Sequence, residues 1–403
     1  MNDRELRDAL HDAGPEDEAA RRRAWQVVSA AYAEHEPHRR RPSRRRLLAL
    51  LAVAALVPIG AAGGAAASAP DSAVGGWVRD VLGVGERDAT PALVEVPGGG
   101  RLLVQGGDGP WVVSGDGAKR RLGDYAGAAW SPNGLFVVAW QDRALTALTP
   151  GGEVRWSLPG PERVGLARWS PVDGFRVAYL AGGELRVVYG DGTNDRRLAA
   201  AARVAPAWRP DAAHVLAYVD ARNRVVVRAA DSRELLWRSD ALTDPVKLAW
   251  SADGRTLLAA TRRSIAVFDA AGRLLYSRPM PAASVLEDAE PAPRGSQVAV
   301  VRRFAAAGRS EVLLLDGSRG LRERELFTGP GRFGSVAWSP AGGRLLIGWQ
   351  EPDQWLFLRP IRPRGGDSVA SAVANIARQF MPGAARPAFP RSVQWCCATR
   401  RDP

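Results

Sequence analysis

Histidine, lysine and cysteine are scarce in this chain of 403 residues. There are four histidines, two lysines (Lys119 and Lys247) and two cysteines, which are neighbours at Cys396 and Cys397. Two adjacent cysteines exclude a disulfide-stapled scaffold and a cysteine-rich zinc module. A bond between adjacent cysteines is strained, so we interpret this pair as small apolar side chains of a terminal strand rather than a redox pair. We expect no metal site and no cofactor.

Catalytic motifs are also missing. The sequence has no Gly-x-Ser-x-Gly elbow and no phosphate-binding Gly-x-x-x-x-Gly-Lys. Its one Gly-x-Gly-x-x-Gly match, Gly329–Gly334, leads into the strand-like Ser335–Trp338, which favours a turn between strands. Glu351 and Asp353 form the one close acid pair near an expected strand end, which is typical of a solvated loop. We expect His214 to be a partly buried strand residue with satisfied nitrogens, and we predict a protein that is not an enzyme.

The net charge of +12 has one local concentration, six arginines that stand directly before residues 47–67. Those 21 residues carry no charge, and their length suits a membrane crossing. Arginines beside an apolar span stay in the cytoplasm. We therefore predict a cytoplasmic tail (1–46), a transmembrane helix (47–67), a stalk (68–90) and an extracytoplasmic remainder in a bacterial cell membrane. The topology signal consists of Arg39, Arg40, Arg41, Arg44, Arg45 and Arg46.

A cleaved export signal is the competing interpretation of this segment. Ala67-Ser68-Ala69 is a small-residue cleavage pattern, and Ser43–Leu48 resembles a twin-arginine signal. Against cleavage stand Pro70, directly after the cut, and the unusual length of the charged region before residue 47. We favour an uncleaved anchor.

The cytoplasmic tail contains a pattern of its own. A helix is expected to begin at Pro15, and it places Ala24, Trp25, Val28, Ala31 and Tyr32 on one apolar face. About 35 residues cannot bury a core alone. This stretch is therefore either a partly disordered tail or a short helix that docks on a cytoplasmic protein through residues 1–35.

Beyond residue 90 a short phrase recurs at an average interval of about 43 residues. It combines Trp with a Ser-Pro or Gly turn, in keeping with the high counts of Gly (43) and Pro (29). Five copies are clear: Ala129–Gly134, Arg168–Gly174, Ala207–Asp211, Ala249–Arg255 and Ala337–Arg344. Two worn copies, Pro291–Gly295 and Val96–Arg101, fill the gaps, and Ser392–Trp395 repeats the strand Ser335–Trp338 without its turn.

This period and the strand-rich intervals predict a β-propeller of four-stranded blades. Seven intervals give seven blades over residues 91–400, and six remain an alternative if Val96–Arg101 is not a real turn. We expect strands near Leu93–Val96 and Ser392–Trp395 to close the ring, because an open ring leaves two exposed sheet edges. The long last interval predicts a helical insertion near 366–388, with Ser368–Phe380 as its helix.

The tryptophans of the phrase have a structural explanation. Trp packs between neighbouring blades, Ser-Pro fixes the backbone entering the turn, and Asn/Asp-Gly supplies positive φ. We assign this structural role to Trp130, Trp169, Trp208, Trp250, Trp338 and Trp395.

The Trp-Ser-Pro-x-Gly turns, each followed by a strand, resemble those of WD-repeat-like propellers of the TolB type. The resemblance covers roughly residues 90 to 400 and implies the fold, whereas relatives of this kind serve as interaction platforms or as lids on hydrolases. The Asn/Asp-Gly pair is lost in the blades of Trp208, Pro291 and Trp338. The tail, crossing and outer domain together also resemble membrane-bound anti-sigma factors, but residues 1–46 contain no Cys and so lack their zinc-binding motif.

These observations predict a non-catalytic single-pass membrane protein whose propeller binds a protein, a peptide or an envelope ligand at its mouth, and no nucleic acid. One alternative is a transmembrane signalling protein of anti-sigma-like organisation. A second alternative is an envelope hydrolase, because a fold does not fix a function.

Overall fold

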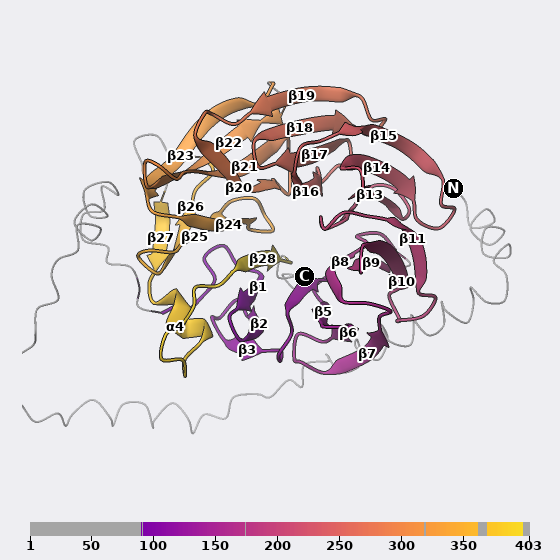
Figure 1. Ribbon diagram of the computed structural model, residues 1–403. Helices are drawn as coiled ribbons and strands as arrows, with labels where there is room; N and C mark the ends of the chain where they lie inside the picture. Colours follow the sequence, from indigo (N-terminus) through magenta and orange to yellow (C-terminus); the bar gives the residue numbers. More distant parts are fainter. Residues whose placement is uncertain (1–89, 91, 174, 318–319, 362–368, 398–403) are drawn as a thin grey trace, which may run out of the picture. The chain divides into compact units, whose positions relative to one another are not determined.

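The computed structural model describes residues 90, 92–173, 175–317, 320–361 and 369–397. These residues form seven four-stranded antiparallel sheets, arranged around a common axis (Figure 1). The prediction of an all-β, seven-bladed propeller is confirmed. The six-bladed alternative is wrong, because residues 101–121 supply three strands of the ring.

Each blade runs from an inner strand at the axis to an outer strand at the rim. Blade 1 consists of β28 (Ser392–Cys396), β1 (Arg101–Gly106), β2 (Gly109–Val113) and β3 (Lys119–Arg121). Blade 2 consists of β4 (Gly127–Trp130), β5 (Val137–Gln141), β6 (Ala144–Leu148) and β7 (Val154–Pro159). Blade 3 consists of β8 (Val164–Trp169), β9 (Arg176–Ala181), β10 (Glu184–Tyr189) and β11 (Arg196–Ala200). Blades 4 and 5 consist of β12 (Ala207–Trp208), β13 (Val215–Val219), β14 (Arg224–Ala229) and β15 (Leu235–Ala241); and β16 (Pro245–Trp250), β17 (Thr256–Thr261), β18 (Ser264–Asp269) and β19 (Leu274–Pro279). Blades 6 and 7 consist of β20 (Ser284–Pro291), β21 (Gln297–Phe304), β22 (Arg309–Asp316) and β23 (Arg322–Pro330); and β24 (Phe333–Trp338), β25 (Leu345–Trp349), β26 (Gln354–Leu358) and β27 (Val369–Val373), which is followed by α4 (Ile376–Phe380).

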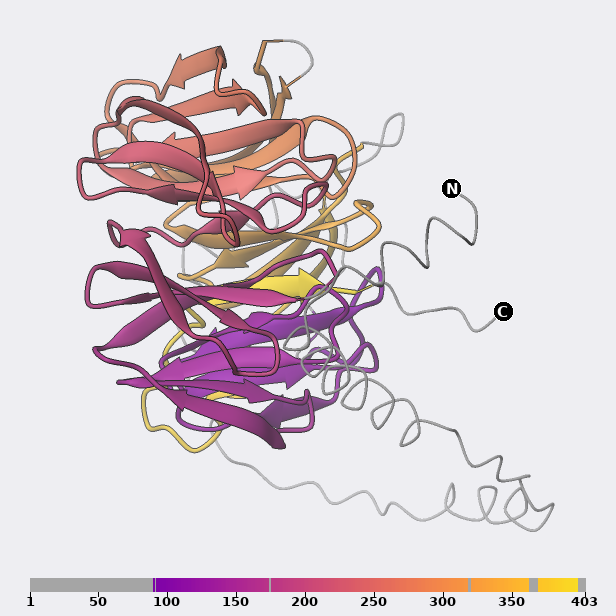
Figure 2. The ribbon, with the colours of Figure 1, turned by 90° about the vertical axis from the view of Figure 1, so that its right-hand side faces the viewer.

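The ring has two chemically distinct faces. In the side view of Figure 2 the strands run from one face to the other. Because successive strands are antiparallel, the turns from inner to second strand all lie on one face, which we call the turn face. The connections between blades and the turns from second to third strand lie on the other, which we call the crossover face.

The two ends of the described chain meet in blade 1. Its inner strand β28 comes from the C-terminal part of the chain and pairs antiparallel with β1. Trp395 lies opposite Leu102, in the register that places Trp130 opposite Val137 in blade 2. The Trp395 indole also donates a hydrogen bond to the Gly99 carbonyl at 2.8 Å. The final fragment is thus the missing first half of the worn phrase Val96–Arg101, and β28 covers the edge that β1 would otherwise expose.

Hydrophobic clusters fill the wedges between adjacent blades. The second and third strands are buried on both faces, so they form continuous apolar runs, as in β13, where all five residues are buried. Outer strands face solvent: β7, β15 and β19 begin with the exposed Val154, Leu235 and Leu274. Burial between blades, rather than inside any single blade, therefore holds the ring together.

Two local predictions are wrong. Leu93–Val96 is not a strand; Leu93 and Val96 pack instead into the core between blades 7 and 1, and β1 supplies the closing partner. Within Ser368–Phe380 the described part begins with a strand, β27, because Val369–Val373 completes the fourth edge of blade 7. The helix is confined to Ile376–Phe380, whose Ile376 and Phe380 are fully buried.

The predicted tail (1–46), crossing (47–67) and most of the stalk (68–90), with the six arginines, lie outside the described residues. In the part that the structure describes, no helix is long and apolar enough to span a membrane.

Candidate functional site

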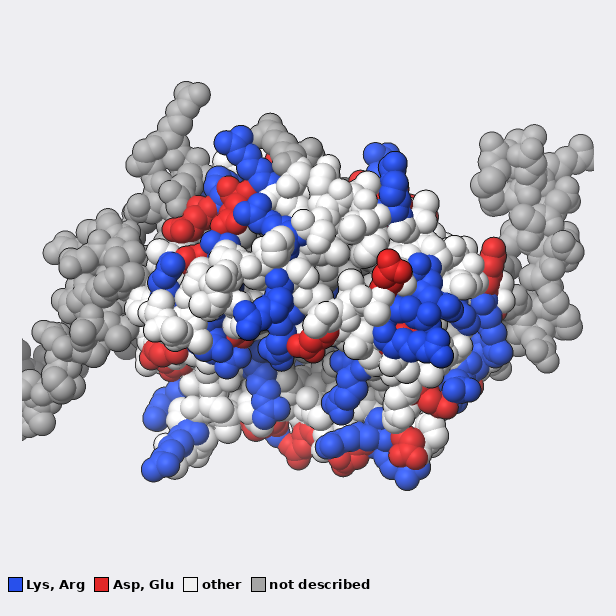
Figure 3. Space-filling model, turned by 45° about the horizontal axis from the view of Figure 1, so that its top comes forward, with Lys and Arg blue, Asp and Glu red and all other residues white. Residues whose placement is uncertain are grey.

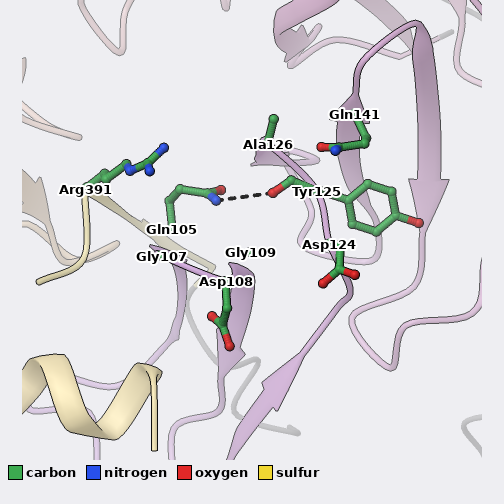
Figure 4. A pocket seen from close by; sticks show the side chains of 9 residues that line it. All are labelled: Gln105, Gly107, Asp108, Gly109, Asp124, Tyr125, Ala126, Gln141 and Arg391. Carbon is green, nitrogen blue, oxygen red and sulfur yellow. Dashed lines mark hydrogen bonds between the residues drawn. The ribbon is translucent and has the colours of Figure 1, made fainter. Parts of the chain in front are cut away.

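A polar pocket opens on the crossover face where blades 1 and 2 meet (Figure 4). Its cavity volume is about 290 Å³. The lining comes from the β1–β2 turn, the β3–β4 connection, the end of β5 and the residue before β28. The lining residues are Gln105, Gly107, Asp108, Gly109, Asp124, Tyr125, Ala126, Gln141 and Arg391, which we call the mouth pocket.

One side of the mouth pocket is acidic. Arg121 pairs with Asp108 at 3.2 Å and also with Asp124, so one guanidinium serves two carboxylates. Asp108 further accepts a hydrogen bond from the Trp111 indole at 3.0 Å. These contacts fix the two carboxylates and leave this side with one negative charge in excess.

The opposite side carries Arg391. Its backbone N–H donates to the Gln105 carbonyl at 2.8 Å, which anchors the residue at the start of the closing strand. The Arg391 side chain is exposed, and it has no hydrogen bond or ion pair with any described residue. Figure 4 shows it across the pocket from Asp124. The pocket thus presents a free guanidinium facing an acidic wall.

Gln105 adds an unsatisfied acceptor between the two walls. Its Nε2 donates to the Tyr125 carbonyl at 3.3 Å (Figure 4), whereas its Oε1 is buried and has no partner in the described chain. A buried polar atom without a partner costs about 1–3 kcal/mol. The exposed guanidinium and the two carboxylates are groups that recognise a polar ligand carrying both hydrogen-bond donors and acceptors, such as a peptide.

The β1–β2 turn that forms part of this wall depends on glycine. Gly109 has φ 126°, and a Cβ at this position would overlap the carbonyl oxygen of Gly123. The turn therefore approaches the β3–β4 connection more closely than any other residue allows.

The repeat tryptophans are placed between blades. Five of them, at positions 130, 169, 208, 250 and 338, are 6–8% exposed. In three the indole N–H donates to an inner-strand carbonyl of the preceding blade: Trp208 to Arg168 at 2.9 Å, Trp250 to Ala207 at 3.2 Å and Trp338 to Glu290 at 2.9 Å. The indole nitrogens of Trp130 and Trp169 are buried without a partner among the described residues. None of the six tryptophans lines the mouth pocket.

His214 lies in the turn before β13, with φ 50°, rather than in a strand. Its Nδ1 contacts Asp231 Oδ2 at 2.6 Å and its Nε2 contacts the Asp173 carbonyl at 3.1 Å. Both ring nitrogens are therefore engaged, as expected. The hydrogen bond from His214, together with Arg176 and Arg196, lowers the pKa of Asp231 well below its usual range despite its partial burial.

The acid pair of the β25–β26 turn consists of two structural groups. Glu351 accepts a hydrogen bond from the Arg332 backbone N–H at 2.6 Å, and Asp353 accepts one from the Ala377 N–H at 2.8 Å. Burial raises the pKa of Asp353. The glycine motif Gly329–Gly334 spans the end of β23 and the start of β24, so it is the connection between blades 6 and 7.

Cys396 and Cys397 are joined by a disulfide, which corrects their interpretation as separate apolar side chains. The pair stands at the end of the closing strand, where Cys396 also packs against the core between blades 1 and 2. Within the described ranges no group of three His, Cys, Asp or Glu residues could hold a metal ion.

Charged side chains are mixed over the surface. On the face shown in Figure 3 basic and acidic residues lie among one another and are separated by uncharged surface. Many of the arginines are paired with carboxylates, for example Arg186 with Asp195 at 2.7 Å.

Comparison with known proteins identifies the fold alone. No family model matches the chain, and no curated protein matches it. Among solved structures, it is similar to a putative 6-phosphogluconolactonase from Bacteroides uniformis (15% identity, TM-score 0.51, covering 73% of this chain and 98% of the other). It is also similar to hydrazine synthase of Kuenenia stuttgartiensis (17% identity, TM-score 0.50, covering 61% of this chain and 85% of the other). A third similar structure is the Cps50 (Swd1) β-propeller domain of Myceliophteria thermophila (12% identity, TM-score 0.49, covering 62% of this chain and 86% of the other).

Identities this low carry no functional residue across. A fold by itself does not fix a function, so this likeness decides neither for nor against catalysis.

Proposed function

We propose that this protein is a single-pass membrane protein of the TolB-like kind, whose propeller lies outside the cytoplasm and binds a protein or peptide partner on its crossover face without catalysing a reaction. The mouth pocket carries the proposal, because it sets the unpaired Arg391 across from the carboxylates of Asp108 and Asp124. The engagement of both His214 nitrogens supports binding over acid–base chemistry.

The binding part of the proposal is tested by photo-crosslinking in cells. A photoreactive amino acid at Gln141, in the pocket, should give a discrete adduct that disappears when Arg391→Gln is added. The same amino acid at Glu153, an exposed residue of the turn face, is the matched control. Equal adducts from both positions, or an adduct that does not depend on Arg391, would refute a site at the mouth pocket.

The topology is tested separately. The six arginines before residue 47 support an inside N-terminus. A reporter that is active only outside the cytoplasm, fused after Val96, should be active, and changing the six arginines to Gln should reduce that activity. Activity of a cytoplasmic reporter at the same position would overturn the orientation.

A second candidate function is transmembrane signalling through residues 1–35. The apolar stripe that includes Trp25 and Tyr32 favours it. The full-length protein should retain a cytoplasmic protein that a Trp25→Asp variant does not. Absence of any such protein would exclude this candidate and leave the propeller proposal intact.

A further inference from the structure

One position of the inner strands differs between blades in a way that the fold does not require. It is the position directly before the tryptophan, and equivalent register places it at the same height in every blade, as Ala129 opposite Val138 and Arg168 opposite Ala178 show. Four blades have alanine there and three have a long polar side chain. The seven residues are Ala129, Arg168, Ala207, Ala249, Glu290, Ala337 and Gln394.

Two of the three polar side chains connect adjacent inner strands. Gln394 accepts from the Trp130 N–H at 3.3 Å and donates to the Ala128 carbonyl at 2.9 Å, which links blades 1 and 2. Glu290 accepts a hydrogen bond from Lys247 at 2.5 Å, which links blades 6 and 5. Both have a structural explanation.

Lys247 also donates to Asp288 at 2.7 Å. Burial opposes its charge, but the two carboxylates raise the pKa of Lys247 above its usual value. The side chains of Lys247, Asp288 and Glu290 are 27%, 17% and 40% exposed, although they stand on the innermost strands. Solvent therefore reaches them from the axis of the ring. Together with Arg168, we call these residues the axial cluster.

Arg168 has no such explanation. Its Nη1 donates to the carbonyl of its own neighbour Ala167 at 2.8 Å, and no described carboxylate lies within ion-pair distance of it. Burial lowers the pKa of Arg168, an effect that the charge of Glu290 only partly offsets. Arg168 is on blade 3 and Glu290 on blade 6, which are not neighbours, so their charges interact across the axis. Most of the five guanidinium donors thus remain unused at a half-buried position of an inner strand.

We propose that Arg168 anchors a binding site at the ring axis for a singly charged carboxylate of a peptide ligand. The planar guanidinium fork matches a carboxylate in two-point geometry. Asp288 and Glu290 border the same space, and Lys247 neutralises only one of them, which disfavours a doubly charged phosphate. The equivalent positions of the two neighbouring blades hold the short side chains of Ala129 and Ala207. This inference rests on the proposed peptide-binding function and adds a second site to it, because Arg168 does not line the mouth pocket.

The test uses the full-length protein and three short capped peptides that differ at one residue, Asp, Asn or phosphoserine, with binding measured by ligand-observed NMR titration. We expect the Asp peptide to bind at least tenfold more tightly than the Asn and phosphoserine peptides. Arg168→Gln should remove this preference, and the matched control Arg255→Gln, an 82% exposed arginine of the turn face, should keep it.

A second variant keeps the test decisive if Arg168→Gln fails to fold. Glu290→Gln removes the carboxylate whose charge acts on Arg168, so it should tighten binding of the Asp peptide severalfold. Unchanged affinity in Glu290→Gln, equal binding of the Asp and Asn peptides, or tighter binding of the phosphoserine peptide would each overturn the inference. The Arg391-dependent crosslink from Gln141 is a separate readout, so failure here is distinguishable from failure of the proposed function.

Discussion

The indole hydrogen bonds between blades predict that chemically identical substitutions will have different costs in neighbouring blades. Trp208 is 6% exposed and donates to the Arg168 carbonyl, whereas Trp169 is 8% exposed and its indole nitrogen has no partner in the described chain. Replacement by Phe removes the same atoms at both sites. Because burial is nearly equal, the loss of apolar contact largely cancels in the comparison.

The hydrogen bond does not cancel. Trp208→Phe loses a bond with a net value of about 1 kcal/mol and leaves the Arg168 carbonyl without this donor. Trp169→Phe instead removes a buried unpaired N–H, which relieves a cost of about 1–3 kcal/mol. We therefore expect Trp208→Phe to reduce the free energy of unfolding by about 2–4 kcal/mol more than Trp169→Phe does.

Urea denaturation, followed by fluorescence and circular dichroism, measures this difference, provided that the two signals coincide and the m value is unchanged. Trp250→Phe should resemble Trp208→Phe, and Trp130→Phe should resemble Trp169→Phe. Equal losses in all four variants would show that the indole bonds do not contribute to the contact between blades.

Three further outcomes follow from named contacts. Glu311→Gln breaks the buried ion pair of Glu311 and Arg302 (2.6 Å) and should lower the free energy of unfolding, measured by urea denaturation, by about 3 kcal/mol. Glu153→Gln, at an exposed ion pair, should change it by less than about 0.5 kcal/mol. Equal costs would contradict the role of burial. The lowered pKa of Asp231 makes its contribution complete above about pH 4 and lost as the pH falls further, so Asp231→Asn should flatten the decline of stability in acid; an unchanged pH profile would refute this. Deletion from residue 392 onward removes the inner strand of blade 1 and exposes β1, so the shortened protein should self-associate in size-exclusion chromatography; a stable monomer would show that closure is dispensable.

The blade count could be predicted from the sequence because a bulky aromatic and a turn recur at an average interval of about 43 residues, and each feature has a direct physical reason. The same pattern could not show that Trp395 completes the turn at Val96–Arg101, because that pairing joins opposite ends of the chain. The sequence prediction instead chose Leu93–Val96, which is apolar enough for a strand but is needed in the core beside blade 7.

The mouth pocket was missed for a related reason. Its residues come from positions 105–126, from 141 and from 391, and no local motif connects them. The axial cluster did leave a signal in the sequence: Arg168 and Glu290 stand at a position that is alanine in four of the seven blades. Departures from a repeat are therefore as informative as the repeat itself, because the shared residues already account for the fold.

That distinction gives Arg168 a further testable consequence. Alanine satisfies the fold at this position in four blades, while burial of a guanidinium without a carboxylate partner costs free energy. Arg168→Ala should consequently leave the unliganded ring as stable as the parent protein or more stable in urea denaturation. Bound carboxylate offsets the cost in the parent protein, so the Asp peptide should raise the stability of the parent and not that of the variant. A large loss of stability in unliganded Arg168→Ala would instead assign Arg168 to the architecture of the ring.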